Sequence, residues 1–474
     1  MTVIEQNLSE LYTSWCGMPA DVITRLAGSG SYRTYYRILG VGGTVVGVHN
    51  ENLRENEAFI SFTNRFVTDG LPVPRVLAVD QSRYIYLLTD LGDKTLYQLL
   101  TEKRTPEDPF PAEIVALYKK SLDWLPVFQL KGGENLDYTL CYPRAAFDRQ
   151  SMMWDLNYFK YYFLKLARIP FDEQALEDDF AGLCDMLTGD EPGFFLYRDF
   201  QSRNIMILDG KPWFIDYQGG RKGALQYDVA SILTDAKADI PMPVRKELLH
   251  YYLDKLSELY PVNREKFLKN YYGFALIRIL QALGAYGFRG YYENKSHFLL
   301  SIPFALRNLG YLRENQKIGF GLHALMEVID TMIDKPEFYF RRSERSVLKV
   351  SIRSFSYKKS IPQDETGNGG GFVFDCRALP NPGRFRQFGE MTGKDQPVID
   401  FLKREPAVDI FLNHVFALVS QSVREYTERG FENLMVSFGC TGGRHRSVYC
   451  AEQLARFLKE QYGLAYTVSH IEQE

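Results

Sequence analysis

Residues 196–219, LYRDFQSRNIMILDGKPWFIDYQG, decide the fold that the chain is expected to adopt. Two apolar runs, 205–208 and 213–215, flank the turn pair Asp209-Gly210. An Asp-Gly pair between two such runs is a strong signal for a β-hairpin. We therefore predict a hairpin whose two outer ends lie side by side.

Three polar residues surround this hairpin. Asp199 precedes Asn204 by five positions, and Asp216 directly follows the second apolar run. In a kinase centre, one carboxylate accepts the proton of an attacking hydroxyl, while an amide and a second carboxylate hold Mg²⁺ on the phosphates of ATP. The spacing predicts Asp199 as the catalytic base, and Asn204 and Asp216 as Mg²⁺ ligands.

A glycine-rich loop, LAGSGS over 26–31, separates strand-like runs near the start of the chain. Backbone N–H groups of such a loop can bind phosphates, which makes four residues candidates for ATP binding: Gly28, Ser29, Gly30 and Ser31. Most loops of this kind are plain turns. The opening hairpin of a kinase is the context that favours the nucleotide.

A helix is predicted over 55–66, because its apolar residues recur at helical spacing. The following strand, 84–92, ends in Asp90-Leu91-Gly92. In a kinase-like fold this would be the hinge strand whose backbone meets the adenine. Asp90 and Leu91 are therefore added to the expected ATP site.

The region after the hinge is expected to be mainly helical. The aromatic-rich segment 152–167 predicts a buried helix, with a substrate-facing role for Asp155 or Tyr158 as a less favoured alternative. Asp228, at the start of an apolar helix, is a candidate N-cap. The glycine-containing segment 279–292 is interpreted equally well as a pocket lining or as a kinked helix pair.

The composition is that of a globular protein with more than one domain. The chain has 474 residues, 45% of them hydrophobic, and a formal net charge of -3. Its six cysteines show no CxxC pair and fit reduced thiols. Without an apolar leader or a run of 18 apolar residues, a cytoplasmic location and no membrane contact are expected. The expected divisions are a kinase N-lobe (1–92), a helical C-lobe (93–335), a linker (336–346) and a last domain (347–474).

The last domain has a second candidate site. A strand over 433–438 leads into the loop GCTGGRHR, 439–446, and Ser447 opens an amphipathic helix. Loop N–H groups and a helix N-terminus together favour an anion, and the loop arginines add positive charge. The plainer alternative is a tight turn with surface arginines.

Cys440 and Arg446 also have the C-x5-R spacing of cysteine-dependent phosphatases, in which a thiolate lies beneath a phosphate-binding loop. Gly439 stands where those enzymes usually carry His. Phosphate binding is therefore expected here, and nucleophilic catalysis by Cys440 is not.

Residues 20–335 resemble the aminoglycoside-phosphotransferase-like kinases. The likeness rests on SYRTYYR, DGLPVPRVLAVD, LLTDLG, YRDFQSRNIMIL, FIDYQGG and YDVASIL. Within that group the chain is most similar to the anomeric N-acetylmuramate/N-acetylglucosamine kinase (AmgK) family of cell-wall recycling. The resemblance implies a bilobal protein-kinase-like fold, ATP and Mg²⁺, and an amino sugar as substrate.

One departure from kinases at large is the strand TVVGVHN, which carries no Lys to steady the α- and β-phosphates. The anomeric-kinase subgroup shares this feature. Arg33 and Arg37 are the candidate replacements, with Glu55 or Glu57 as the partner.

Residues 347–474 resemble the C-terminal domain of the RNase adaptor RapZ family, through SFSYKKSIP, FDCRALPNP, MTGKDQPV and GCTGGRHRSVYCAEQLA. The resemblance implies small-RNA binding and an amino-sugar phosphate effector. By position, the phosphosugar pocket would comprise Arg377, Asn381, Cys440, Thr441, Gly442, Gly443, His445, Arg446 and Ser447. RNA binding is not favoured, because this domain has 16 Lys and Arg against 15 Asp and Glu, a difference of +1, and no basic tail.

The leading hypothesis is an ATP- and Mg²⁺-dependent sugar 1-kinase with a regulatory domain that binds an amino-sugar phosphate. A kinase for choline, homoserine or an aminoglycoside is the alternative within the enzyme class. Aminoglycoside kinases favour acidic pockets, and no concentrated acidic run is present in the C-lobe. A RapZ-type adaptor that binds RNA and senses metabolites is the alternative from another class.

Overall fold

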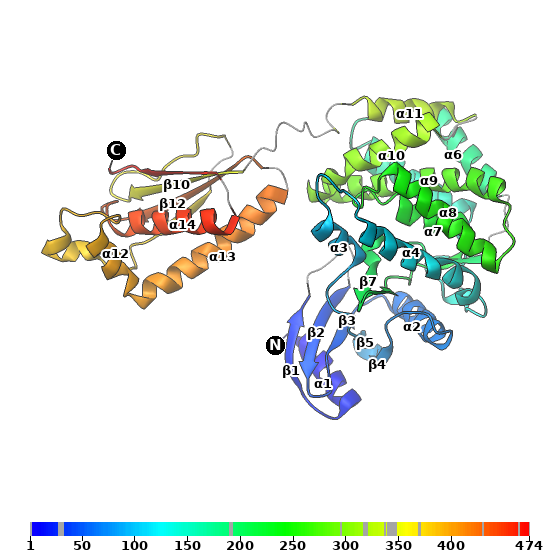
Figure 1. The fold of residues 1–474 in the computed structure, drawn as a ribbon, viewed down its shortest axis with the longest axis horizontal. Coiled ribbons are helices and arrows are strands. Elements are labelled where there is room, and N and C mark those ends of the chain that lie inside the picture. Colours follow the sequence, from blue (N-terminus) through cyan, green and yellow to red (C-terminus); the bar gives the residue numbers. More distant parts are fainter. Residues whose placement is uncertain are drawn as a thin grey trace. The chain divides into compact units, whose positions relative to one another are not determined.

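The computed structural model describes residues 2–26, 33–188, 193–293, 296–315, 321–335, 338, 348–367, 371–428, 431–462 and 465–473. The chain forms two compact units, Met1–Tyr339 and Phe340–Glu474 (Figure 1). The expected linker, 336–346, lies outside the described residues except for Phe338.

The first unit opens with an antiparallel sheet in the order β1-β2-β3-β5-β4. Its elements are α1 (Val3–Cys16), β1 (Ala20–Arg25), β2 (Thr34–Gly40), β3 (Val45–His49), α2 (Leu53–Thr68), β4 (Val76–Asp80) and β5 (Ile85–Thr89). Helix α1 begins with a capping box between Thr2 and Glu5 and ends at Gly17, whose φ of 76° suits glycine. Its buried Leu8 and Tyr12 pack against β2, β3 and β5 in one small apolar cluster.

Helix α2 confirms the helix expected over 55–66. The Asn52 side chain accepts a hydrogen bond from the backbone N–H of Glu55 and so caps the helix. One face is buried, and on it the Phe59 ring stacks on Tyr217, with centroids 5.2 Å apart and planes 9° apart. The Thr63 and Tyr217 hydroxyls are 2.6 Å apart. The helix is thereby joined to the segment that follows the central hairpin.

The rest of the first unit is mainly helical (Figure 1). Its helices are α3 (Leu96–Lys103), α4 (Ala112–Val127), α5 (Arg149–Phe159), α6 (Glu173–Leu187), α7 (Leu225–Leu233), α8 (Met242–Leu259), α9 (Arg264–Gly287), α10 (Ile302–Asn315) and α11 (His323–Ile333). Helix α9 contacts α5, α7 and α10, so it is the central helix of this lobe.

The glycines of segment 279–292 serve close packing of α9. A Cβ at Gly287 would lie 2.0 Å from the Tyr162 backbone oxygen, and one at Gly284 would lie 2.9 Å from the Phe159 nitrogen. Only glycine allows these backbones to approach so closely. Of the two interpretations of this segment, the helix-packing one explains the glycines.

The predicted hairpin is confirmed. Strands β7 (Ile205–Leu208) and β8 (Lys211–Phe214) pair antiparallel, with Ile205 opposite Phe214. The backbone N–H of Ile215 donates to the carbonyl of Asn204 at 3.1 Å, which extends the pairing to the residue before Asp216. A second short pair, β6 (Phe194–Leu196) and β9 (Arg221–Gly223), encloses the whole segment.

Asp228 is not an N-cap, contrary to the sequence-based expectation. Helix α7 begins at Leu225 with Ala224 at its cap position, so Asp228 lies inside the helix and is fully buried. Its carboxylate accepts the backbone N–H groups of Tyr197 (2.8 Å) and Arg198 (2.9 Å). The helix therefore holds the segment that leads to Asp199.

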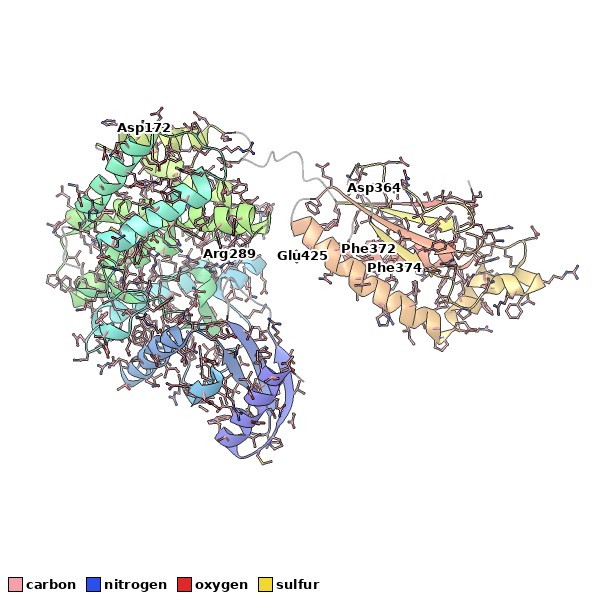
Figure 2. The ribbon with its side chains drawn as sticks, turned by 180° about the vertical axis from the view of Figure 1, so that it is seen from behind. Asp172, Arg289, Asp364, Phe372, Phe374 and Glu425 are labelled. Carbon is pink, nitrogen blue, oxygen red and sulfur yellow. The ribbon has the colours of Figure 1, made fainter. Side chains whose placement is uncertain are left out.

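The second unit is built on a parallel four-stranded sheet in the order β11-β12-β10-β13. Its elements are β10 (Lys349–Ser356), β11 (Phe372–Asp375), α12 (Gln396–Lys403), α13 (Pro406–Glu428), β12 (Asn433–Cys440), α14 (Arg446–Tyr462) and β13 (Tyr466–His470). Phe372 and Phe374 lie on β11 (Figure 2), and their rings stack with centroids 5.4 Å apart. Phe374 also meets Phe411 of α13 edge-on. The unit has a hydrophobic core of its own.

Within the described ranges, none of the helices combines the length and the apolar character needed to cross a bilayer.

Candidate functional site

The structure brings Asp199, Asn204 and Asp216 together. The Asn204 amide nitrogen donates to the backbone oxygen of Asp199 at 2.9 Å and to Asp216 Oδ2 at 3.2 Å. Asp199 keeps 41% of its side chain exposed, so its carboxylate is open to an acceptor molecule. Asp216 has a φ of 68°, an uncommon conformation for a residue other than glycine. Such strain is typical of functional positions.

A buried ion pair positions the chain just before Asp199. Arg198, itself at φ 81°, donates to both carboxylate oxygens of Asp155, at 2.7 and 2.8 Å, and to the Tyr227 hydroxyl at 2.5 Å. Burial opposes the charge of Arg198, yet Asp155 and Tyr227 raise the pKa of the guanidinium above its ordinary value. Asp155 is thus a buried anchor, and the substrate-facing alternative does not describe its contacts.

Asp228 anchors the same segment from α7. Burial raises the pKa of its carboxyl to about 7, although the hydrogen bonds from the backbone of Tyr197 and Arg198 favour the charged form.

The oxygens at this site fit a divalent cation. The Asn204 amide uses its nitrogen for both hydrogen bonds, which leaves Oδ1 as an oxygen ligand. Beside it, Gln218 donates to Asp216 Oδ1 at 2.7 Å, while its own Oε1 is buried and has no hydrogen-bond partner among the residues that the structure describes. No cluster of three or more His, Cys, Asp or Glu suited to a metal occurs among the described residues. Two protein oxygens completed by phosphate oxygens is the usual arrangement for Mg²⁺ with ATP.

Arg33, a candidate for the role of the missing strand lysine, lies between α2 and the segment after the hairpin. Its guanidinium lies 3.0 Å from Glu55 of α2 and 3.9 Å from Asp216, and its side chain is only 2% exposed. Burial opposes the charge, but the neighbouring Tyr86, Tyr35, Glu55 and Asp216 raise the pKa of Arg33. Helix α2 and the hairpin therefore meet at one fixed cation.

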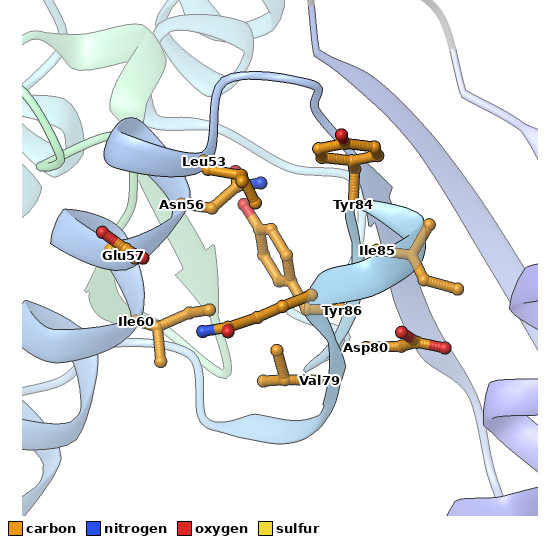
Figure 3. Close-up of a pocket in the computed structure, with 10 residues that line it drawn as sticks. Leu53, Asn56, Glu57, Ile60, Val79, Asp80, Tyr84, Ile85 and Tyr86 are labelled. Atoms are coloured by element: carbon orange, nitrogen blue, oxygen red, sulfur yellow. The ribbon is translucent and has the colours of Figure 1, made fainter.

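The other candidates of this group lie elsewhere. Arg37 is bound by Asp90 (2.6 Å) and Asp93 (2.6 Å), so two carboxylates neutralise its charge. Glu57 is two positions from Glu55, on the opposite side of α2, and takes part in no ion pair within the described part of the chain. It lines a small pocket with Leu53, Ile60 and Tyr84 (Figure 3). Arg33 with Glu55 is thus the pair that the geometry brings to Asp216.

Of the remaining residues predicted to bind ATP, the structure describes Asp90 and Leu91. Asp90 accepts hydrogen bonds from Arg37 and from the backbone of Gly92, and Leu91 is buried. The glycine-loop candidates Gly28, Ser29, Gly30 and Ser31 lie outside the described residues.

Arg278 of α9 is a site residue that the sequence did not reveal. Its Nη2 lies 3.7 Å from Asp199 Oδ1, its Nε donates to the Ser231 hydroxyl at 3.0 Å, and its Nη1 donates to Gln281. An arginine inside a predicted helix gives no motif, so only the fold connects it to Asp199.

In the second unit, the loop after β12 encloses the Cys440 sulfur. The Gly443 N–H donates to Sγ at 3.2 Å, and the Ser447 hydroxyl lies 3.2 Å from it. Burial alone would raise the pKa of Cys440, but the hydrogen bonds of Ser447, Gly442 and Gly443 lower it below the ordinary thiol value. The C-x5-R spacing thus corresponds to a loop that stabilises negative charge.

Arg446, only 4% exposed, begins α14 beneath this loop. Its Nη1 donates to the carbonyls of Arg377 (2.8 Å) and Leu379 (2.9 Å), and its Nη2 reaches the Thr441 hydroxyl at 3.5 Å. No carboxylate lies within 4 Å of its guanidinium in the described residues. Its direct hydrogen bonds go to neutral oxygens, and the carboxylate that its charge affects, Asp375, is itself paired with Arg377, so Arg446 can still attract an anion.

The other predicted pocket residues are near this loop but are engaged differently. The Arg377 guanidinium pairs with Asp375 at 2.7 Å and lies over the Tyr357 ring. Asn381 caps a short turn at Gly383, and a ring nitrogen of His445 is 2.9 Å from the carbonyl of Phe388. Arg377 therefore contributes its backbone carbonyl, which accepts a hydrogen bond from Arg446, whereas its side chain contacts Asp375 and Tyr357.

Two family models match the chain. That of the phosphotransferase enzyme family matches residues 22–264, slightly more than half of the 474 residues. The chain therefore belongs to the phosphotransferase enzyme family. The model of the RapZ C-terminal domain matches residues 348–474, so the second unit is a RapZ-type domain. Both broader resemblances are confirmed, and the likeness to the anomeric kinases stays a prediction.

Among curated relatives, the chain is similar to a "Nucleotide-binding protein" of Pseudothermotoga lettingae, with 34% identity over 144 residues, 30% of this chain and 47% of that protein. The chain spans about half the length of the curated relatives it matches, 47%, 39% and 54% for three of them.

Among solved structures, it is similar to a thermostable mutant of aminoglycoside phosphotransferase APH(4)-Ia, with 14% identity, 64% of this chain and 98% of that chain covered, and a TM-score of 0.42. It is also similar to choline kinase from Cryptosporidium parvum Iowa II, with 10% identity, coverage of 65% and 93%, and a TM-score of 0.43. The expected fold class, a bilobal kinase-like unit followed by a separate α/β domain with a strand–glycine loop–helix, is confirmed by the family matches and the sheet topology.

Proposed function

We propose that the first unit is an ATP- and Mg²⁺-dependent kinase that phosphorylates the anomeric hydroxyl of N-acetylmuramate or N-acetylglucosamine. The observation that carries the kinase assignment is the cluster of Asp199, Asn204 and Asp216, linked by hydrogen bonds of 2.9 and 3.2 Å. The choice of sugar rests on the resemblance to the anomeric kinases. It is supported by Arg33, which stands in for the strand lysine.

The protein residues have distinct roles in this proposal. Asp199 accepts the proton of the acceptor hydroxyl. At the same time the hydroxyl oxygen bonds to the γ-phosphorus of ATP, and the bond between the γ-phosphorus and ADP breaks. Asn204 and Asp216 would hold Mg²⁺, which would neutralise charge on the ATP phosphates. Arg33, fixed by Glu55, adds a positive charge at the same place. Asp155 and Asp228 hold the backbone that carries Asp199.

The test is incubation with ATP, Mg²⁺ and a panel of free sugars, with the phosphate located by phosphorus NMR. A signal at the anomeric position of either N-acetylated sugar is expected. Asp199→Asn should abolish turnover yet leave nucleotide binding largely intact. Asp209→Asn, an exposed position in the turn of the same hairpin, is the matched control. Phosphorylation of choline, homoserine or an aminoglycoside instead would contradict the sugar assignment.

For the second unit we propose binding of an amino-sugar phosphate as a regulatory ligand. The Cys440–Ser447 loop and buried Arg446 suit the phosphate. Next to Gly443 lies Glu472, whose side chain is 10% exposed and whose Oε1 is buried without a hydrogen-bond partner in the described part of the chain. Its Oε2 pairs with Lys359 at 2.7 Å. A carboxylate beside an anion site suits the ammonium group of an amino sugar.

Calorimetric titration of the full chain with glucosamine 6-phosphate and with glucose 6-phosphate tests this proposal. The amine-bearing ligand should bind more tightly, and Glu472→Gln should remove the difference. Equal binding of the two ligands would exclude Glu472 as the amine ligand. Binding of RNA that persists at moderate salt would instead favour the adaptor alternative.

A further inference from the structure

Arg278 lies next to the proposed catalytic base. Its side chain is 7% exposed, whereas that of Asp199 is 41% exposed, and the two are 3.7 Å apart. The guanidinium is therefore a fixed positive charge beside the proposed catalytic base. We propose that Arg278 selects the acceptor by charge, admitting neutral and anionic hydroxyl compounds and excluding cationic ones. This inference rests on the proposed kinase function.

The charge of Arg278 is not cancelled by its other partners. Ser231 and Gln281, which accept its remaining hydrogen bonds, are neutral. Within the ranges that the structure describes, Asp199 is the one carboxylate within 4 Å of its guanidinium. When Asp199 takes up the acceptor proton, the positive charge of Arg278 is left facing the acceptor without a counter-ion.

Neighbouring charged groups do not reverse this balance. Asp235 accepts hydrogen bonds from the Ser202 hydroxyl at 2.8 Å and the Lys237 backbone at 3.2 Å, and forms no ion pair with Arg278. Burial and the nearby Asp235 raise the pKa of the half-buried Tyr286 to about 12, while Arg278 and Arg203 oppose the rise. The side chain of Arg203 is exposed. The two arginines are therefore matched by Asp199 and Asp235 while Asp199 is ionised, and the balance becomes positive once Asp199 takes up the acceptor proton.

Arg278 therefore separates acceptors that differ in charge close to the reacting hydroxyl. In a sugar phosphorylated at C1, the substituent on C2 is the nearest one. An ammonium group there would be repelled by the guanidinium, a neutral N-acetyl group would be accepted, and a carboxylate on the neighbouring carbon would be attracted. Two unit charges a few ångströms apart near a protein surface change an equilibrium by about tenfold or more.

Two pairs of sugars isolate the charge from the shape. Glucose has a hydroxyl at C2, where glucosamine has an ammonium group. N-acetylmuramate differs from N-acetylglucosamine in carrying an additional ether substituent with a carboxylate. We would measure kcat/KM for the four sugars with the full chain, at about pH 6.5 where the amine is protonated. The wild type should favour glucose over glucosamine by about tenfold, and N-acetylmuramate over N-acetylglucosamine by a smaller factor.

Two variants and a matched control assign this preference to one residue. Arg278→Gln should bring the glucose-to-glucosamine ratio to within about threefold of unity, whereas Arg278→Lys, which keeps the charge, should restore most of the preference. Arg245→Gln is the control, because Arg245 is 7% exposed in the same lobe and donates to Ile240 and Asn308. It should leave the ratio unchanged.

The outcomes separate this inference from the proposed function. If none of the four sugars is phosphorylated, the sugar-kinase proposal fails. If they are phosphorylated but the wild type does not discriminate between glucose and glucosamine, the role of Arg278 is refuted without any variant. The same conclusion follows if Arg278→Gln discriminates as the wild type does.

Discussion

Replacing Asp155 with Asn should destabilise the first unit by about 3 kcal/mol. The Asp155 and Arg198 side chains are only 10% and 15% exposed and share hydrogen bonds of 2.7 and 2.8 Å. Removal of one partner of a buried ion pair costs about 3–5 kcal/mol, because the other charge is left unpaired. The lower figure applies because an Asn oxygen can still accept one of the two hydrogen bonds.

This free energy converts into a measurable change in melting temperature. An unfolding entropy of about 2.1 cal/mol/K per residue gives about 0.7 kcal/mol/K for a unit that spans Met1–Tyr339. The loss of about 3 kcal/mol then lowers Tm by about 4 °C. All four tryptophans, Trp15, Trp124, Trp154 and Trp213, lie in this unit, so tryptophan fluorescence of the full chain reports its unfolding alone.

Two further variants test whether the loss of stability comes from the unpaired buried charge. In Asp155→Leu combined with Arg198→Met, no charge is left buried, so the double variant should be more stable than Asp155→Asn. Asp185→Asn removes a carboxylate from a surface pair whose side chains are 48% and 63% exposed, and should change stability by less than about 1 kcal/mol. The reasoning would be refuted by a Tm for Asp155→Asn within about 1 °C of the wild-type Tm. It would also be refuted if the double variant were less stable than Asp155→Asn.

Three other outcomes are expected. Arg33→Met should lower kcat/KM for ATP about a hundredfold, and Glu55→Gln should lower it about tenfold, because Glu55 acts only by positioning Arg33. Steady-state kinetics that show equal losses for the two variants would contradict this. Because Asp228 is expected to titrate near 7 when folded and near 3.8 when unfolded, the folded state binds the proton more tightly, and its contribution to stability is lost as pH rises from about 4 to 7. In Asp228→Asn, Tm should no longer show this fall between about pH 4 and pH 7. A slope of Tm against pH equal to that of the wild type would contradict the role of Asp228. Iodoacetamide at neutral pH should modify Cys440 at least about tenfold faster than Cys376, which is also buried and whose pKa is raised. Equal rates by mass spectrometry would exclude a stabilised thiolate at Cys440.

Local sequence patterns were sufficient for the elements that carry the site. The β7–β8 hairpin follows from two short apolar runs around Asp209-Gly210, and α2 follows from its apolar spacing. The strand, glycine loop and helix of the second unit are equally local, because β12 and α14 are adjacent in sequence. Each of these signals lies within a few residues of the feature that it predicts.

Contacts between distant residues could not be found in this way. Asp155 meets Arg198 across 43 positions and Asp228 meets Tyr197 across 31, so no short motif contains either pair. Arg278 reaches Asp199 only because α9 crosses the lobe. The N-cap expectation for Asp228 shows the same limit. An acidic residue near a helix start suggested a local hydrogen bond, whereas the tertiary fold directs its carboxylate to the Tyr197 and Arg198 backbone.

The contact between α2 and the hairpin segment has a consequence for control of the enzyme. In kinases that are switched by moving the helix that carries the glutamate, the ion pair forms only in the active state. Here the stacking of Phe59 on Tyr217 and the Thr63–Tyr217 hydrogen bond lie in the core. Swinging α2 outward would open a cavity and leave a buried hydroxyl unpaired, at a cost of several kcal/mol. The Arg33–Glu55 pair is therefore a permanent part of the fold, and this helix is not available as a switch.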